Sequence, residues 1–280
     1  MKNCFLLISL ILLQSSINYC QTDSVNPSDI KFTILYDDMP LNESFIGDQG
    51  FSCLIEIKGK LYLFDAGNVE SVLKRNTEKL NVDCSKIETI FISHLHTDHI
   101  CGLGGIIEKC NKPLLILPSE FPKTQTPKAK GYVEETLKKA EGIVSNIITI
   151  KGPSKIGDYF YSTGVMEEKT YEQSLIINTS KGLIILVGCS HPGIVEIVKQ
   201  AKAQLKKDVY FVMGGFHLEG KKYPEKIKDI ADELKGLTKY IAAGHCNDEK
   251  AQEIFKGTFG KKFVNIKAGL SFKISDFESN

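Results

Sequence analysis

The sequence predicts an α/β fold, namely a four-layer αββα sandwich in which two mixed β-sheets pack face to face with helices on the outside. The main observation is that paired strands come first, strands then alternate with helices, and this scheme appears twice along the chain. The chain of 280 residues, 42% of them hydrophobic, is long enough to bury a large core, and no linker divides it. We therefore expect one folded domain over residues 31–275.

The first half of the chain shows strand pairs, then a helix, and then the strand that leads into a histidine-rich loop. Alternating or continuous apolar runs indicate the strands, and apolar residues at helical spacing indicate the helix. The elements expected here are strands over residues 31–36, 50–57, 61–64, 87–92 and 112–117, a helix over 69–80, and a helix that begins over 105–110.

The second half repeats the scheme after a segment rich in Pro, Lys and Thr over residues 118–131. We expect this segment to be a surface insertion, of the kind that often forms lids over sites. The elements expected after it are a hairpin over 174–178 and 183–187, helices over 132–140, 193–205, 224–234 and 248–255, and strands over 146–150, 159–162, 209–213, 239–242 and 263–266.

Residues 1–20 have the layout of a secretory signal peptide, because Lys2 precedes an apolar run over residues 5–13 and a polar segment follows. The run is too short to span a bilayer, so we expect no membrane span. Cys20 is either the lipid-bearing residue of a bacterial lipoprotein or lies near an ordinary cleavage site; the alternative to both is a buried N-terminal strand or helix. The sequence thus predicts an exported, periplasmic or extracellular protein, with residues 21–30 as a tether and a lipid anchor if Cys20 is modified.

The charge balance argues against a nucleic-acid partner. The formal net charge is +1, and Arg75 is the only arginine, so there is no basic surface excess and almost no capacity for bidentate phosphate recognition. We expect a small-molecule substrate. A phosphate-bearing substrate would have to rely on metal ions, lysine side chains and backbone amides.

The cysteines fit no disulfide framework, because the six that follow residue 20 are spread widely through the chain. Cys101 and Cys110 are near enough in sequence to pair across a short helix, although spacing alone does not decide this. Cys189 and Cys246 each stand beside a candidate site residue.

A histidine cluster directly after the strand over residues 87–92 is the strongest chemical signal. His94, His96, Asp98 and His99 fall within six residues and include half of the six histidines in the chain. Imidazole and carboxylate are preferred ligands of zinc and similar divalent metals. In a loop these side chains can face two different points, which favours a two-metal centre. The alternative interpretation is a polar loop with scattered histidines.

The other three histidines repeat this setting, because His191, His217 and His245 each follow an apolar strand and a glycine or another small residue. A single histidine of this kind is more often a satisfied structural residue than a ligand. The same pattern at four strand ends is harder to explain by packing, so we expect the loops to converge on one site.

Taken together, these motifs resemble those of the metallo-β-lactamase fold superfamily. His94, His96, Asp98 and His99 match its principal ligand motif, and Gly244-His245 matches its late ligand. The resemblance implies that Asp65, at a strand end, supports the metal loop from behind the ligands. It also implies that the hairpin ending at Cys189 delivers the metal-bridging position.

The sequence departs from the superfamily pattern at one ligand. The usual histidine before that hairpin is missing, since residues 155–173 contain none. We expect His191 to supply the third imidazole of the first metal instead, with Cys189 as the alternative ligand. The first metal is then assigned to His94, His96 and His191, and the second to Asp98, His99 and His245.

A narrower resemblance points to one branch of the superfamily, named for a dihydropterin–ribofuranosylaminobenzene-phosphate synthase. It rests on the segments around residues 50–52, 188–195, 214–218 and 244–246. The branch name is a weak guide to the substrate, because a shared fold does not fix function. Gln49 also stands where the branch leads us to expect a histidine.

The favoured function is a binuclear hydrolase of a small phosphoester, ester or lactone, with two divalent metals, zinc first and iron or manganese as alternatives. Asp98 is expected to orient the nucleophile, and His217 to be a general acid or hydrogen-bond donor, unless it is merely structural. Alternatives are a pterin-related transferase or synthase, a non-catalytic metal- or ligand-binding protein, and an iron redox site. The redox site is less favoured because the chain lacks the appended flavin-binding region of oxidoreductase relatives.

Overall fold

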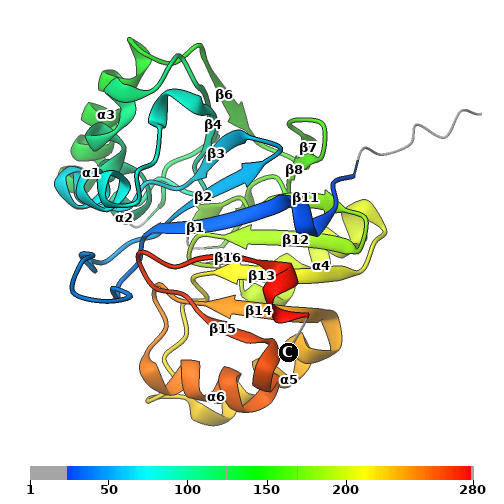
Figure 1. Cartoon of the computed structure of the whole chain (residues 1–280). Coiled ribbons are helices and arrows are strands. Elements are labelled where there is room, and N and C mark those ends of the chain that lie inside the picture. Colours follow the sequence, from blue (N-terminus) through cyan, green and yellow to red (C-terminus); the bar gives the residue numbers. More distant parts are fainter. Residues whose placement is uncertain (1–23, 124, 169, 279–280) are drawn as a thin grey trace, which may run out of the picture.

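The computed structural model describes residues 24–123, 125–168 and 170–278 (Figure 1). The predicted signal peptide over residues 1–20, including Cys20, lies outside the described residues and stays a prediction. Within the described residues, no helix is long and apolar enough to cross a membrane.

The first sheet has seven strands, and its pairing changes from antiparallel to parallel along the sheet. Three antiparallel pairs are followed by three parallel pairs in the order β16-β1-β2-β3-β4-β5-β6. The strands are β1 (Ile30–Tyr36), β2 (Ser52–Ile57), β3 (Lys60–Phe64), β4 (Ile87–Phe91), β5 (Leu114–Pro118), β6 (Asn146–Ile150) and β16 (Ser271–Lys273).

The second sheet repeats this arrangement, again with three antiparallel pairs followed by three parallel ones. Its order, read from the antiparallel end, is β7-β8-β11-β12-β13-β14-β15. The strands are β7 (Ser154–Lys155), β8 (Phe160–Ser162), β11 (Leu175–Thr179), β12 (Gly182–Val187), β13 (Val209–Gly214), β14 (Thr238–Ala243) and β15 (Phe263–Asn265), and a separate pair joins β9 (Met166–Glu167) to β10 (Tyr171–Glu172).

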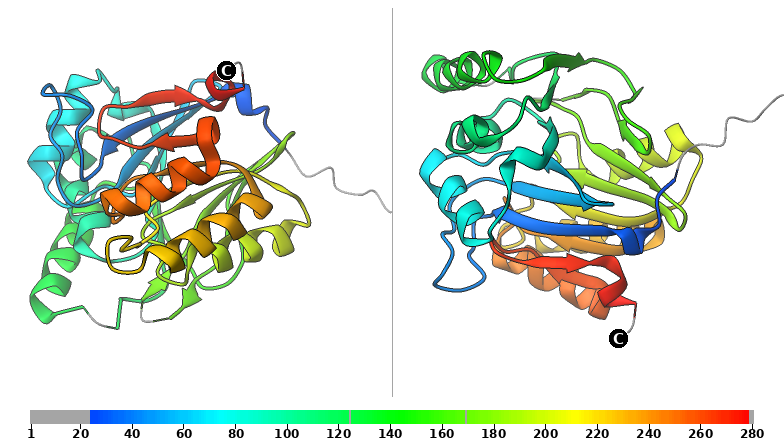
Figure 2. Two further views of the ribbon diagram at one scale, coloured as in Figure 1. Left: turned by 90° about the horizontal axis from the view of Figure 1, so that it is seen from below. Right: turned by 45° about the horizontal axis from the view of Figure 1, so that its top comes forward.

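Helices cover the two outer faces of the paired sheets (Figure 2). One apolar cluster, which includes Phe32, Phe64 and Phe211, draws its residues from both sheets and fills the space between them. A second cluster packs the first sheet against its helices, and a third packs the second sheet against its own. The helices are α1 (Glu70–Lys79), α2 (Thr97–Ile100), α3 (Pro127–Glu141), α4 (Ile194–Leu205), α5 (Pro224–Leu237) and α6 (Glu249–Phe259). The predicted αββα sandwich is therefore confirmed.

Three local predictions are wrong. The tether over residues 21–30 is folded at its end, because Val25 is buried and bridges Thr179. No α-helix begins over residues 105–110; short 3-10 turns occupy Cys101–Gly105 and Ile107–Lys109 instead. The expected insertion over 118–131 is shorter than predicted, since Thr126 caps α3 through the backbone of Ala129.

The six cysteines in the described part of the chain are all free. Cys101 and Cys110 therefore do not pair, which settles the alternative that their spacing left open. Cys189 lies buried at the end of β12, and Cys246 lies half-buried beyond β14.

Candidate metal centre

The candidate site forms where parallel strands of both sheets end. Val187 of β12, Gly214 of β13 and Ala243 of β14 are register partners, so the loops that follow them leave the second sheet side by side. The loop that follows β4 leaves the first sheet toward the same place. The side chain of Gln173 joins the two sheets here, because its Nε2 donates to the carbonyl of Ile92 at 2.9 Å. The predicted convergence of histidine loops is thus present in the structure.

The histidine-rich segment after β4 is partly helical rather than a plain loop. His96 precedes α2, whose single turn carries Asp98 and His99 inward. Gly102 lies where an added Cβ would come within 2.1 Å of the Ala66 carbonyl oxygen. Only glycine therefore allows the chain beyond α2 to pass this close to the end of β3.

Asp65 supports this segment from behind, as the family resemblance implied. Its carboxylate accepts hydrogen bonds from the Ser93 backbone N–H and hydroxyl, both at 2.7 Å, and lies 2.7 Å from His99 Nδ1. Asp65 is fully buried, and burial raises its pKa well above the usual range. The contact to Nδ1 leaves His99 Nε2 facing the centre of the site, which is the arrangement that ligating histidines commonly show.

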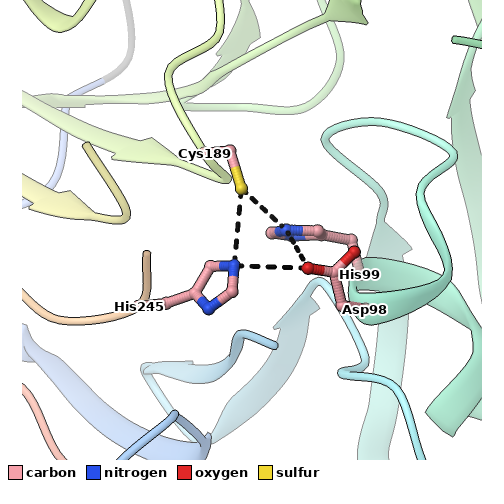
Figure 3. Close-up of side chains that lie close together, drawn as sticks. All are labelled: Asp98, His99, Cys189 and His245. Atoms are coloured by element: carbon pink, nitrogen blue, oxygen red, sulfur yellow. Dashed lines mark hydrogen bonds and ion pairs between the residues drawn. The ribbon is translucent and has the colours of Figure 1, made fainter. Parts of the chain in front are cut away.

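Four side chains converge on one point and form the candidate second metal position (Figure 3). Cys189 Sγ lies 3.2 Å from His99 Nε2 and 3.4 Å from His245 Nε2. Asp98 Oδ2 lies 3.6 Å from His245 Nε2 and 3.9 Å from His99 Nε2. Tetrahedral zinc with bonds of about 2.0–2.3 Å separates its ligand atoms by about 3.3–3.8 Å, so these four atoms fit such an ion.

The candidate first metal position lies directly beside it. His94 Nε2 is 3.1 Å from His96 Nδ1, and the ring of His191 lies 5.0 Å and 5.1 Å from those two rings, centre to centre. His94, His191 and Cys189 also form a group whose ligand atoms lie within 4.8 Å of one another. Cys189 therefore faces both positions, whereas the sequence offered it only as an alternative to His191.

The protonation of these histidines suits metal binding. Burial, reinforced by the neighbouring imidazoles, holds the pKa of His94 and His99 well below the usual value and that of His191 at about 3. The rings are therefore neutral at pH 7, the form that binds metals. His191 Nε2 is buried and has no hydrogen-bond partner among the described residues, which a bound cation would satisfy. The donor set thus fits two divalent ions.

Sequence reasoning missed the acidic pair Asp37 and Asp38, which directly follows the strand predicted over residues 31–36. Asp38 Oδ1 lies 2.6 Å from His245 Nδ1, and Oδ2 accepts the Cys246 backbone N–H at 3.1 Å. Asp37 is buried and accepts the His245 backbone N–H at 2.8 Å. Burial disfavours protonation of His245, but the negative charges of Cys246 and Asp38 outweigh it and raise its pKa to about 10. A cation that binds here must therefore displace a proton.

His217 lies at the rim of the site, where it forms a third group with Cys189 and Cys246 whose ligand atoms lie within 4.8 Å of one another. Its side chain is exposed, and its ring centre is 5.0 Å from that of His191. Contact with Cys246 raises the pKa of His217. Both His191 and His217 line a cavity of about 400 Å³, which also touches Phe216, Lys226 and the start of α4. A larger cavity of about 780 Å³ between α1 and α3 reaches Thr97 but touches none of the predicted ligands.

These observations define an αββα protein with a candidate metal centre, and comparison with known proteins places it in a family. The model of the metallo-beta-lactamase superfamily matches residues 46–199 of the 280, and the chain belongs to this superfamily. It is 31% identical, over 86% of its length and 95% of the relative, to the 7,8-dihydropterin-6-methyl-4-(β-D-ribofuranosyl)-aminobenzene-5′-phosphate synthase of Methanocaldococcus jannaschii. The predicted superfamily and branch are thus confirmed.

Solved structures agree on the fold. Tm1679, described as a metal-dependent hydrolase of the β-lactamase superfamily, superposes with a TM-score of 0.68 at 24% identity over 87% of this chain and 98% of its own. The short form of human tRNase Z superposes with a TM-score of 0.59 at 14% identity, over 87% of this chain and 99% of its own. At these identities the likeness concerns the fold alone.

Proposed function

We propose that this protein is a binuclear metal-dependent hydrolase of a small phosphoester, ester or lactone. The observation that carries the proposal is the pair of adjoining ligand groups that share Cys189 and open toward a cavity lined by His191 and His217. A cavity of this size that adjoins convergent polar groups is the usual form of a small-molecule site. Divalent metals bound here would supply Lewis acidity and a nucleophile at neutral pH.

The protein's own residues would orient the reactants. The Asp98 carboxylate lies between His99 and His245 and is 16% exposed. A water molecule can therefore reach it, and the carboxylate can orient that water and accept its proton. Gln49 Nε2 donates to Asp98 Oδ2 at 3.5 Å, so a second polar side chain contacts that carboxylate. His217 stands at the rim, where it can donate a hydrogen bond or a proton to the departing group.

A second candidate is a bond-forming reaction on a pterin-like substrate. It is favoured by the near full-length match to the synthase of Methanocaldococcus jannaschii. The same ligands would serve either reaction, because both require a polarised oxygen and a positioned proton acceptor. Only assays with the substrates of each reaction can distinguish the two candidate functions.

The test combines metal content with activity. Purified protein is expected to hold about two equivalents of metal and a His96→Ala variant clearly fewer, because His96 contributes to the first position. The metal-loaded protein is then assayed on phosphodiester, ester and lactone substrates. Separately, it is assayed on a 7,8-dihydropterin that carries a leaving group on its 6-methyl carbon, together with a 4-(β-D-ribofuranosyl)-aminobenzene 5′-phosphate, so that the new bond forms as the leaving group departs. The control is Lys60→Ala, an exposed change at the opposite end of β3.

The outcomes are distinct. Hydrolysis by the wild type and the Lys60→Ala control, with loss in His96→Ala, supports the hydrolase. Turnover of the pterin pair alone supports the second candidate. Protein that keeps its metal yet acts on neither panel contradicts both and favours a binding role.

A further inference from the structure

One buried carboxylate holds the loop that follows β12. Glu172, at the end of β10, is 1% exposed. No Lys or Arg pairs with it in the part of the chain that the structure describes, so backbone amides satisfy its charge. Oε1 accepts the N–H groups of Gly188 at 3.0 Å, Cys189 at 3.1 Å and Ser190 at 3.0 Å, and Oε2 accepts the N–H of His191 at 2.8 Å. Because four backbone N–H groups donate to this one carboxylate, we expect it to fix the conformation of the loop.

The four residues depend on Glu172 to different degrees. Gly188 directly follows the strand, and its carbonyl also accepts the Gly215 N–H at 2.9 Å, so Cys189 comes next to a backbone that is already fixed. His191 lies two residues farther on, beyond Ser190, whose φ of 61° is uncommon for a residue with a side chain. The surroundings must hold such a turn, and Glu172 contacts the backbone on both sides of it.

The direction of His191 follows from that turn. Its ring lies within 5.1 Å of the rings of His94 and His96, centre to centre, and its Nε2 is the buried atom without a hydrogen-bond partner. A change in the backbone at Ser190 would rotate this nitrogen away from the other two imidazoles.

We propose that Glu172 is the positioning residue of the first metal position. Its carboxylate fixes the left-handed turn at Ser190 and thereby directs His191 Nε2 toward His94 and His96. This inference rests on the proposed pair of metal positions. Glu172 also accepts the Cys189 N–H, but His99 and His245 of the second position are anchored separately, by Asp65 and Asp38. Loss of the Glu172 carboxylate should therefore weaken the first position selectively.

The experiment compares Glu172→Gln with Asp38→Asn, a matched change behind the second position, and with His191→Ala. The wild type is expected to bind two equivalents of zinc, and Glu172→Gln to bind one equivalent unchanged and the other about 10- to 100-fold more weakly. The double variant Glu172→Gln/His191→Ala should lose no more metal affinity than His191→Ala alone. With cobalt, the thiolate absorption band of Cys189 should persist in Glu172→Gln and weaken in Asp38→Asn.

Several results would overturn the inference. Two tight equivalents in Glu172→Gln would show that His191 needs no such support, and loss of the cobalt–thiolate band would show that the effect is not selective. If Glu172→Gln does not fold, Glu172→Asp keeps the charge and replaces it in the test. Failure of both to fold, while His191→Ala folds, would assign Glu172 to folding instead. A wild type that binds fewer than two equivalents contradicts the proposed function itself, and the inference with it.

Discussion

At the scale of single residues, the site depends on carboxylates that face backbone amides and imidazoles rather than lysine or arginine. Asp65 and Glu172 are buried, whereas the Asp38 side chain is 37% exposed. Asp65 contacts Ser93 twice and His99 once. Asp38 contacts His245 in the loop beyond β14, and Glu172 accepts the His191 N–H in the loop beyond β12. A buried carboxyl group is costly unless it is hydrogen-bonded, and both Asp65 and Glu172 are. The carboxylates thus fix the loops that carry the ligands.

Replacement of Asp65 by Asn should weaken both folding and metal binding. The amide keeps the size of the side chain, but its NH2 group faces donors, so at least one buried hydrogen bond is lost. We expect a loss of about 2–3 kcal/mol in the free energy of unfolding, measured with urea. Metal affinity should fall about 10- to 100-fold in a zinc titration. Asp158→Asn, an exposed change, is the control and should alter neither.

These carboxylates also mark the limit of prediction from sequence. His94, His96 and His99 were recognisable because ligand types that recur within six residues have a chemical explanation. Asp38 was not, because its partner His245 lies 207 positions away, and an acidic residue in a loop is ordinary. The available signal was that Asp37 and Asp38 directly follow a strand, because the candidate histidines show the same strand-end pattern.

At the scale of elements, the parallel strands of the second sheet meet at a glycine. Gly214, the last residue of β13, has a φ of 134°, and an added Cβ would lie 2.0 Å from the Val187 carbonyl oxygen of β12. The loops that carry Cys189 and His217 leave the sheet at this point. Close approach of the two strand ends therefore determines where both loops start.

Gly214→Ala should separate the ends of β12 and β13. Backbone cannot move away easily inside a sheet, so we expect a loss of about 3 kcal/mol in the free energy of unfolding, with lower metal affinity. Gly131→Ala is the matched control, because Gly131 lies within α3 and an added Cβ there meets nothing within 4 Å. That change should stabilise by about 0.5–1 kcal/mol. Equal effects of the two changes in thermal unfolding would contradict this explanation.

Most elements were predictable because their apolar periodicity was long enough to show. The helix expected at 105–110 failed for a physical reason: an added Cβ at Gly105 would lie 2.2 Å from the Glu70 carbonyl oxygen. The glycines there serve close packing against α1, and the chain takes short 3-10 turns instead. The short strand β16 was missed because three residues show no periodicity, and pairing with β1 creates it.

At the scale of the whole molecule, the candidate ligands come from both sheets. His94, His96 and His99 follow β4 of the first sheet, whereas His191 and His245 follow β12 and β14 of the second. The two halves of the chain repeat one strand-pairing scheme. The site lies where the ends of the parallel strands in the two sheets come together. Metal bound here would cross-link the halves in the folded state, and the unfolded chain could not offer this arrangement.

Removal of metal should therefore lower the stability of the whole domain rather than of one loop. A ligand at 100 times its Kd stabilises the folded state by about 2.7 kcal/mol per site. For a domain of this size, that corresponds to a fall in Tm of about 5–10 °C for each site emptied by a chelator. Calorimetry should show a single transition that moves down on chelation and returns when zinc is added. A His96→Ala/His245→Ala variant lacks one ligand at each position, so its transition should hardly respond to either treatment. A transition that splits in two on chelation would show that the sheets unfold separately, against the single core cluster that both sheets share.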